Sequence, residues 1–336
     1  MSDDTSAFAL QANHARYHGQ VQGHYESFFL RANHPDRTLA FWIRYTIFSP
    51  RSCPGKARGE LWAVFFNGEK GRHAAVKVDL PIQDCFFDTA KFHVRVGDAW
   101  LTSRGLSGAV YGASHAISWD LSYEGGQEPL LLLPEKLYST KLPAAKSLVG
   151  QPMARFRGRV QVDGETIDIH DWTGSQNHNW GSKHTDLYAW GQVAGFDTHP
   201  ESFLELATAK LKLGPFRSPA FTLVVLRHAG REYAANGLLQ AVKARGAFDY
   251  FTWRFTSKTP LMEIDGTMTA RPEDFVCLGY RNPPGGIKYC LNSKIASCRL
   301  RFSDLKEGIS ETLETRSRAA FEILTDDAGH GIFVSA

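Results

Sequence analysis

Residues 170–192 contain the densest group of chemically reactive side chains in this chain. The segment carries three histidines, two carboxylates and three tryptophans: His170, His178, His184, Asp171, Asp186, Trp172, Trp180 and Trp190. Imidazole and carboxyl groups transfer protons, and aromatic faces stabilise cations. The segment therefore indicates proton transfer beside an aromatic surface. A structural role, in which the aromatic rings fill a core and the histidines form hydrogen bonds, is the open alternative.

The three histidines do not match a metal-binding motif. Their spacings of eight and six residues fit no common zinc pattern, and we expect Gly174 to form a turn between His170 and His178. We predict no metal and no organic cofactor. The chain also lacks a nucleophile elbow, a phosphate-binding loop and a dinucleotide fingerprint, which argues against nucleotide chemistry.

Turn signals and short apolar runs predict an all-β fold around this segment. Asn-Gly and Asp-Gly pairs favour two-residue hairpin turns, and they occur at residues 67–68, 163–164, 236–237 and 265–266. Runs rich in aromatic and β-branched residues predict strands at 39–48, 116–123, 202–211, 221–227, 248–256 and 299–302. Residues 305–324 begin with helix-like spacing, but their second half alternates and predicts a strand.

The two halves of the chain share three similar segments in the same order. The pairs are 31–41 with 196–206, 62–68 with 223–230, and 118–122 with 252–256. In the first pair, His34 and His199 begin a common His-Pro-acid pattern, for which turn formation is a sufficient explanation. In the third pair, Trp119 and Trp253 take the same place. We infer a duplicated domain with loops of unequal length.

The sequence therefore predicts two lipocalin-like antiparallel β-barrel or sandwich domains in tandem, with few helices. Many short strands connected by hairpins favour a closed barrel or a sandwich, because closure of a sheet removes its exposed edges. Pro143 and Pro152 lie in a turn-rich stretch that favours a domain boundary. We expect an N-terminal extension over 1–20, a first barrel over 21–148, and a second barrel over 149–336 that carries the His/Trp motif.

Composition narrows the classes of partner. The formal net charge is +3 over 336 residues, with Lys and Arg scattered, so we expect no nucleic-acid binding. Five cysteines without a Cys-x-x-Cys pair indicate reduced thiols and a cytoplasmic protein. We expect no transmembrane segment, while peripheral membrane contact and the oligomeric state stay open. His14, His18 and His24 are expected to be exposed.

One stretch resembles a known family. Residues 174–181, Gly-Ser-Gln-Asn-His-Asn-Trp-Gly, followed by the aromatic run 188–192, are similar to the Gly-x-x-Asp-His-x-Trp-Gly signature of the hydroxyneurosporene synthase (carotenoid 1,2-hydratase) and AttH-like family. Tocopherol cyclases are more distant relatives of that family. The resemblance implies tandem lipocalin-like barrels and a cofactor-independent hydratase or cyclase. The substrate would be an apolar isoprenoid, polyene or polyketide-like molecule in a barrel or between barrels.

His178, Trp180 and Gly181 match the signature, but Asn177 stands where the family usually has Asp. A carboxylic acid can protonate an alkene, whereas a carboxamide cannot. Three other groups are therefore candidates for the catalytic proton donor: Asp171, Glu26 and His178. Burial against tryptophan would keep a carboxyl group protonated near neutral pH.

Aromatic and polar side chains near the motif are candidates for substrate binding. They are Asn177, Trp180, Tyr188, Trp190, Trp62 and Trp42. Packing in a core is the alternative for each aromatic residue. Because Asn177 replaces the expected acid, a non-catalytic carrier of hydrophobic ligands remains the alternative function.

Overall fold

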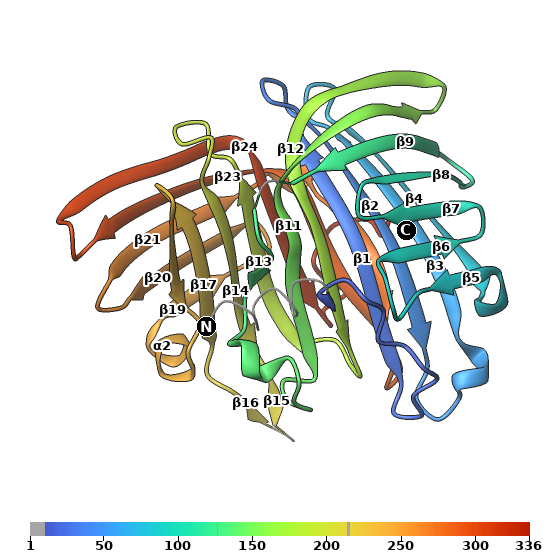
Figure 1. Ribbon diagram of the computed structural model, residues 1–336, viewed down its shortest axis with the longest axis horizontal. Coiled ribbons are helices and arrows are strands. Elements are labelled where there is room, and N and C mark those ends of the chain that lie inside the picture. The colour runs from blue at the N-terminus through green and yellow to red at the C-terminus, as the bar shows by residue number, and fades with distance from the viewer. Residues whose placement is uncertain (1–10, 126, 214–215) are drawn as a thin grey trace.

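The computed structural model describes residues 11–125, 127–213 and 216–336, and its architecture is two curled antiparallel sheets side by side (Figure 1). The first sheet has twelve strands: β1 (His24–Asn33), β2 (Leu39–Ser49), β3 (Arg58–Asn67), β4 (Arg72–Pro81), β5 (Cys85–Phe87), β6 (His93–Val96), β7 (Ala99–Thr102), β8 (Gly105–Tyr111), β9 (Ala116–Glu124), β10 (Leu130–Leu131), β11 (Ala145–Val162) and β12 (Glu165–Gly181).

The second sheet has ten strands: β13 (Leu187–Ala194), β14 (Phe203–Lys210), β17 (Phe221–His228), β18 (Arg231–Ala235), β19 (Arg245–Phe248), β20 (Thr252–Lys258), β21 (Met262–Thr269), β22 (Val276–Arg281), β23 (Ile287–Asp304) and β24 (Ile309–Thr325). The short strands β15 (Lys212–Leu213) and β16 (Phe216–Arg217) pair only with each other.

Helices are short and few in the described part of the chain. There is one α-helix, α2 (Leu238–Lys243), and four 3₁₀ turns: η1 (Pro54–Lys56), η2 (Ile82–Asp84), η3 (Glu135–Leu137) and η4 (Pro272–Asp274). The sheets form a nearly closed barrel and a half-barrel, which confirms the predicted all-β, lipocalin-type class. No helix among the described residues is both long and apolar enough to span a bilayer.

The sheets repeat one strand order, β4-β3-β2-β1-β12-β11-β9-β8 in the first and β18-β17-β14-β13-β24-β23-β21-β20 in the second. Two of the three pairs of similar sequence segments agree with this order. They align β2 with β14 and β3 with β17, and the strands of each pair take the same place in their sheets. The third segment pair aligns β9 with β20, whereas the counterpart of β9 by position is β21. Trp119 and Trp253 are therefore not equivalent in the fold.

The predicted boundary after residue 148 falls inside β11, a strand of the first sheet. The chain passes from the first sheet to the second only after β12, through residues 182–186. We propose the division between the two units at that linker. The His/Trp motif then spans both units, because β12 carries residues up to Gly181 and β13 carries Tyr188 and Trp190.

One of the four predicted two-residue hairpin turns is present: Asp163-Gly164 joins β11 to β12, with positive φ at both residues. A hairpin also joins β3 to β4, but its loop spans residues 68–71 and its positive φ is at Gly71. The turn predicted at Asn236-Gly237 is wrong, since this pair leads into α2. The turn at Asp265-Gly266 is also wrong, because both residues pair inside β21, where the Phe255 ring covers Gly266. Within a strand, Asp265 can point to solvent and Gly266 leaves room for the ring, so neither residue requires a turn.

Gly174 also lies within a strand rather than a turn. It pairs with Ala32 of β1, and a Cβ atom at position 174 would stand 1.8 Å from the Arg31 carbonyl oxygen. Glycine is therefore required by the close approach of a neighbouring backbone. As a result β12 runs unbroken through the motif, and its alternating residues face opposite sides of the sheet.

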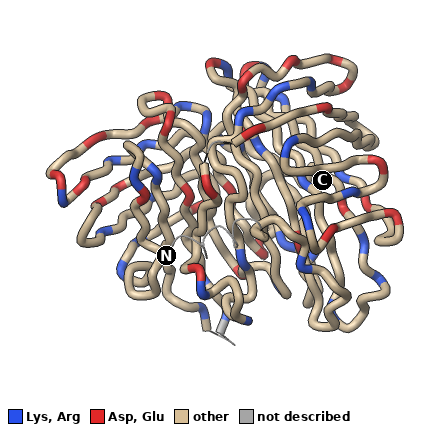
Figure 2. The backbone as a smooth tube through the Cα atoms, in the orientation of Figure 1, with Lys and Arg blue, Asp and Glu red and all other residues tan. Residues whose placement is uncertain are grey.

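That alternation gives the central strands two buried faces. On one side of β2, Phe41, Ile43 and Tyr45 fill the core of the first barrel. On the other side, Trp42 joins an apolar cluster with residues of the second sheet, including Trp190 and Tyr280. The two sheets lie side by side (Figure 1), and the side chains between them form an additional core. Charged residues of both signs are interspersed over both units (Figure 2).

Candidate functional site

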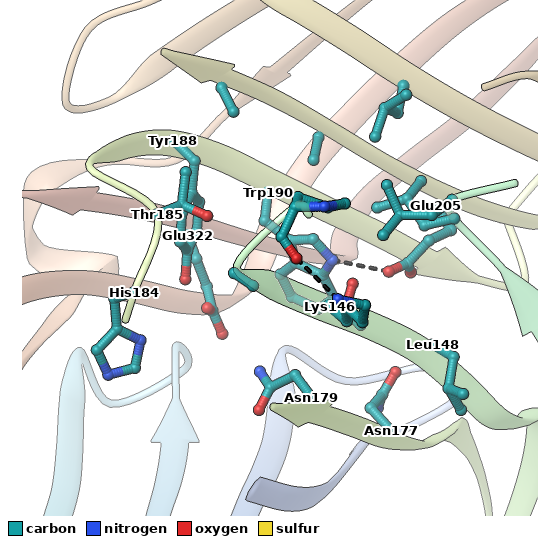
Figure 3. A pocket seen from close by; sticks show the side chains of 18 of the residues that line it. Lys146, Leu148, Asn177, Asn179, His184, Thr185, Tyr188, Trp190, Glu205 and Glu322 are labelled. Atoms are coloured by element: carbon teal, nitrogen blue, oxygen red, sulfur yellow. Dashed lines mark hydrogen bonds between the residues drawn. The ribbon is translucent and has the colours of Figure 1, made fainter. Parts of the chain in front are cut away.

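A cavity lies between the two sheets, where the inter-sheet core is incompletely filled (Figure 3). Its walls come from β1, β2, β11 and β12 of the first sheet and from β13, β14, β17, β22 and β24 of the second. The cavity volume is about 160 Å³, and the cavity is partly open to solvent. A cavity of this size holds a small ring system, so a larger ligand would extend through the opening.

Two carboxyl groups line this cavity, Glu322 and Glu205. Glu322 pairs with the buried ammonium group of Lys294 at 2.7 Å, whereas Glu205 has no ion-pair partner among the described residues. Glu205 lies on β14 between Leu204 and Leu206, which face the barrel core, and its own side chain points between the sheets. Its two oxygens accept hydrogen bonds of 2.8 Å from the indole N–H of Trp190 and from Gln192 Nε2. Burial raises the pKa of Glu205 to about 7 despite these hydrogen bonds. The group therefore carries a proton in a large fraction of molecules near neutral pH.

Gln192 connects Glu205 to Asn177. Its Nε2 donates to Asn177 Oδ1 and to Glu205 Oε2, each at 2.8 Å. Its own oxygen accepts from Arg31 Nε at 2.8 Å and from Ser175 Oγ at 2.6 Å, which fixes the orientation of the amide. Gln192 thus links the Asn177 carboxamide of the first sheet to a carboxyl group supplied by the second sheet.

Arg44 and Trp42 add positive charge and a free N–H donor to the lining of the cavity. Arg44 is buried and donates to Ser27 Oγ from Nε at 2.8 Å and from Nη2 at 2.5 Å, while its guanidinium lies 4.3 Å from the Tyr280 ring centre. Among the described residues no carboxylate comes within ion-pair distance of it. The buried Trp42 Nε1 has no hydrogen-bond partner in the described part of the chain. Both donors favour an oxygen-bearing ligand.

Glu26 and His178 are brought together, but on the opposite face of the first sheet. Their side chains meet at 2.8 Å, and Glu26 also bonds His24 at 3.0 Å and the Arg16 backbone N–H at 2.9 Å. Burial would raise the pKa of Glu26, yet the hydrogen bonds from His178 and His24 outweigh it and lower that pKa to about 2. The raised carboxyl pKa expected for Glu26 is therefore wrong.

The remaining partner of His178 comes from the N-terminal segment. Its Nδ1 lies 2.7 Å from the carbonyl oxygen of Ala12, and its ring stacks on Phe28 at 4.2 Å. Neither Glu26 nor His178 lines the cavity. His24 is buried, contrary to its predicted exposure, because Glu26 holds it inside.

Asp171, predicted as a candidate proton donor, lies on the surface and does not line the cavity. Its carboxylate is 51% exposed and pairs with Arg157 at 2.7 Å. The backbone at Asp171 has φ of 53°, which marks an irregularity in β12 near its solvent-exposed end. Asp171 therefore lies outside the cavity, among surface side chains.

Four of the six predicted binding residues line the cavity: Asn177, Tyr188, Trp190 and Trp42. Trp180 instead packs on His178 at 4.6 Å and under the Arg16 guanidinium at 4.3 Å. Trp62 packs edge-on to Tyr280, beside the cavity, with Lys77 over its ring. The alternation along β12 separates Trp180 from Asn177, because neighbouring odd and even positions face opposite sides.

Sequence reasoning missed Glu205 and Arg44. Each is a single charged residue in an apolar strand, a pattern typical of a half-exposed strand face. The only signal was their isolation among residues that are otherwise apolar. That these faces are covered by the other sheet is decided by the tertiary structure.

Two curled sheets in tandem, a nearly closed barrel and a half-barrel, define a lipocalin-type, AttH-like fold with a cavity between the sheets. No family model matches the chain. In sequence it is 24% identical to an uncharacterized protein of Mycobacterium tuberculosis over 304 residues, 89% of this chain and 86% of that protein.

Two solved structures have a similar fold. One is a protein assigned as AttH from Nitrosomonas europaea, with 13% identity, a TM-score of 0.59, and coverage of 94% of this chain and 95% of that chain. The other is kievitone hydratase from Nectria haematococca, with 11% identity, a TM-score of 0.58, and coverage of 92% and 93%. At these identities the likeness establishes the fold.

Proposed function

We propose that this protein is an acid-catalysed hydratase or cyclase that acts on an apolar, alkene-containing small molecule in the inter-sheet cavity. The observation that carries the proposal is Glu205, a buried carboxyl group with a pKa raised to about 7 in an aromatic cavity. A general acid works best when its pKa lies near the working pH. The hydratase similar in fold and the sequence resemblance to carotenoid hydratases support the same kind of reaction.

In the proposed reaction the Glu205 O–H transfers its proton to an alkene carbon of the substrate. A C–H bond forms and the adjacent carbon becomes a carbocation. In a hydratase, water then adds to that carbon and a proton returns to the Glu205 carboxylate. In a cyclase, a second alkene of the same molecule attacks that carbon and closes the ring, which leaves a new carbocation. A neighbouring C–H bond of this cation then breaks, its electron pair forms an alkene, and the proton returns to the Glu205 carboxylate. Trp190, Trp42 and Tyr188 supply aromatic surface along the cavity for the cationic stage.

Asn177 then has a positioning role. The acid of the family signature is replaced by a carboxamide, and Gln192 links that carboxamide to Glu205 through two hydrogen bonds of 2.8 Å. We propose that the proton donor has moved from the first sheet to the second while keeping the same cavity. Glu26, His178 and Asp171 are not required as donors in this proposal.

The substrate class follows from the two kinds of side chain that line the cavity. Its walls are mostly aliphatic and aromatic, which suits an isoprenoid, polyene or polyketide-like chain. Elsewhere in the lining, Arg44 and the free N–H of Trp42 would bind a carboxylate, enolate or carbonyl oxygen. An apolar chain ending in an acidic or carbonyl group satisfies both.

The test is incubation of the purified chain with polyene acids, polyprenyl acids and the corresponding alcohols, followed by mass spectrometry. A mass gain of one water indicates hydration, and an isomeric product with altered retention indicates cyclisation. Glu205→Gln is expected to abolish product while ligand binding persists, and Leu223→Ile serves as a matched change in the cavity wall. Turnover that is unchanged in Glu205→Gln would refute the assignment.

The same experiment decides the alternative function. A carrier of hydrophobic ligands would return each bound molecule unchanged from both the wild type and Glu205→Gln. The substitution of Asn177 for the family acid is the observation that favours a carrier. Tight binding without conversion across all substrate classes would therefore replace the enzyme proposal with the carrier.

A further inference from the structure

Three metal-ligating side chains converge at the second sheet, away from the inter-sheet cavity. His199 lies in the loop between β13 and β14, His228 ends β17, and Glu311 lies near the start of β24. Their ligand atoms all lie within 4.8 Å of one another. His228 Nε2 is 2.6 Å from Glu311 Oε2, and His199 Nε2 is 4.0 Å from the same oxygen. Ligand atoms around tetrahedral zinc are about 3.3 Å apart, so shifts of under about 1 Å would suffice.

The other nitrogen of each imidazole is already held by a hydroxyl group. His228 Nδ1 is 2.7 Å from Ser202 Oγ, and His199 Nδ1 is 2.9 Å from Thr198 Oγ1. Such outer hydrogen bonds orient metal-binding histidines and leave Nε2 for the ion. A hydroxyl can accept or donate, so His228 can move its proton from Nε2 to Nδ1 without losing Ser202. The Nε2 atom of His199 forms no hydrogen bond among the described residues.

The loop that carries His199 is fixed in place. Asp197 accepts hydrogen bonds from the Thr315 hydroxyl at 3.0 Å and from the Arg316 backbone N–H at 2.9 Å. The backbone N–H of Asp197 donates to the Glu314 carbonyl at 2.8 Å. The loop and β24 therefore hold His199 and Glu311 in one arrangement, which lowers the entropy cost of assembling a site.

We propose that His199, His228 and Glu311 form a zinc site. Two imidazoles and one carboxylate are a ligand set that Zn²⁺ prefers, and the fourth position would take a water molecule. The water is accessible because the side chains of His199 and Glu311 are 29% and 38% exposed, while His228 is 6% exposed. The ion ties the 195–202 loop to β17 and β24. Sequence spacing does not reveal this site, because its ligands come from three distant segments.

The test uses the full chain stripped of metal with EDTA and titrated with ZnCl₂ by isothermal calorimetry. We expect one ion per chain with a dissociation constant on the order of 1 µM or tighter, and a Tm increase of about 3 °C or more at saturating zinc. His199→Ala and Glu311→Gln are expected to weaken binding at least tenfold. Titration with Co²⁺ should give the visible absorption of a tetrahedral site in the wild type and lose it in both variants.

The matched control is His115→Ala, which removes a half-buried histidine paired with a carboxylate at 2.8 Å. This variant is expected to bind zinc like the wild type. Circular dichroism of each metal-free variant checks that it is folded. Zinc affinity that is equal in the wild type, His199→Ala and Glu311→Gln would assign binding to other groups, such as the exposed Cys53, and overturn the proposal. The outcome does not depend on the reaction proposed for the cavity.

Discussion

Replacing Glu205 with glutamine tests the physical basis of the proposed acid directly, without knowledge of the substrate. The pKa of Glu205 is raised from 4.5 to about 7 in the folded protein because the group is fully buried. Between these pH values the folded state retains a proton that the unfolded chain releases. The free energy of unfolding therefore falls as pH rises from about 4.5, and the loss is complete above about 7.

The size of the effect follows from the shift in pKa. A rise of this size corresponds to about 3 kcal/mol, at 1.36 kcal/mol for each pH unit. The Glu205→Gln variant lacks this titration. It also disturbs one of the hydrogen bonds from Trp190 and Gln192, since an amide has a single acceptor oxygen, and this costs about 1 kcal/mol at every pH. The pH-dependent part is thus separable from the constant part.

The assay is urea unfolding of the wild type and Glu205→Gln at pH 4, 5, 6, 7, 8 and 9. We expect the variant to be slightly less stable at pH 4 and more stable at pH 9, with the difference changing by about 3 kcal/mol between them. Leu223→Ile in the same cavity should show no such trend. A stability difference that is flat over this range would refute a raised pKa at Glu205 and remove the basis for general-acid catalysis.

Three further outcomes follow from the structure. Glu26→Gln should lower the free energy of unfolding by up to about 3 kcal/mol at pH 7, because the pKa of Glu26 is lowered to about 2 in the folded protein. This loss of stability should shrink as the pH falls from 4.5 towards 2. A loss that stays constant with pH in urea unfolding would contradict the lowered pKa. Gly174→Ala should cost more than about 2 kcal/mol by thermal unfolding, because the new methyl group meets the Arg31 carbonyl, whereas Gly164→Asn in an open turn should cost less than about 1. Arg44→Met should weaken binding of a polyene acid at least tenfold by fluorescence titration and leave the matching hydrocarbon unaffected; equal losses for both would exclude a role for Arg44 in recognising an acidic end.

The strand pattern of this chain was largely predictable. Alternating and apolar runs located β2, β9, β14 and β17 within a few residues, because side-chain direction in a strand depends only on local geometry. The hairpin at Asp163-Gly164 followed from the backbone freedom of those two residues, which both have positive φ. The second half of residues 305–324 was correctly assigned to a strand, although its beginning forms a turn and not a helix.

Glycine had two meanings that the sequence does not separate. At Gly164 it permits a turn with φ of 88°, whereas at Gly174 and Gly266 it makes room for a neighbouring backbone or ring. The wrong turn predicted at Gly174 led to the expectation of a broken strand. Only the neighbouring strand, supplied by distant parts of the chain, distinguishes the two cases.

The sequence by itself determined the fold class and located the segment, residues 170–192, that is rich in aromatic and polar side chains. It also placed Asn177, Trp190 and Tyr188 among the candidates that line the cavity. The tertiary structure decided which face of each strand is a cavity wall. It also buried Glu205 in that wall, and this burial raises the pKa of its carboxyl group towards neutrality. The physical reason is that a strand residue has a direction fixed by its neighbours in the chain, but its pKa and contacts depend on what covers that face. Here the cover is a second sheet that begins after residue 181.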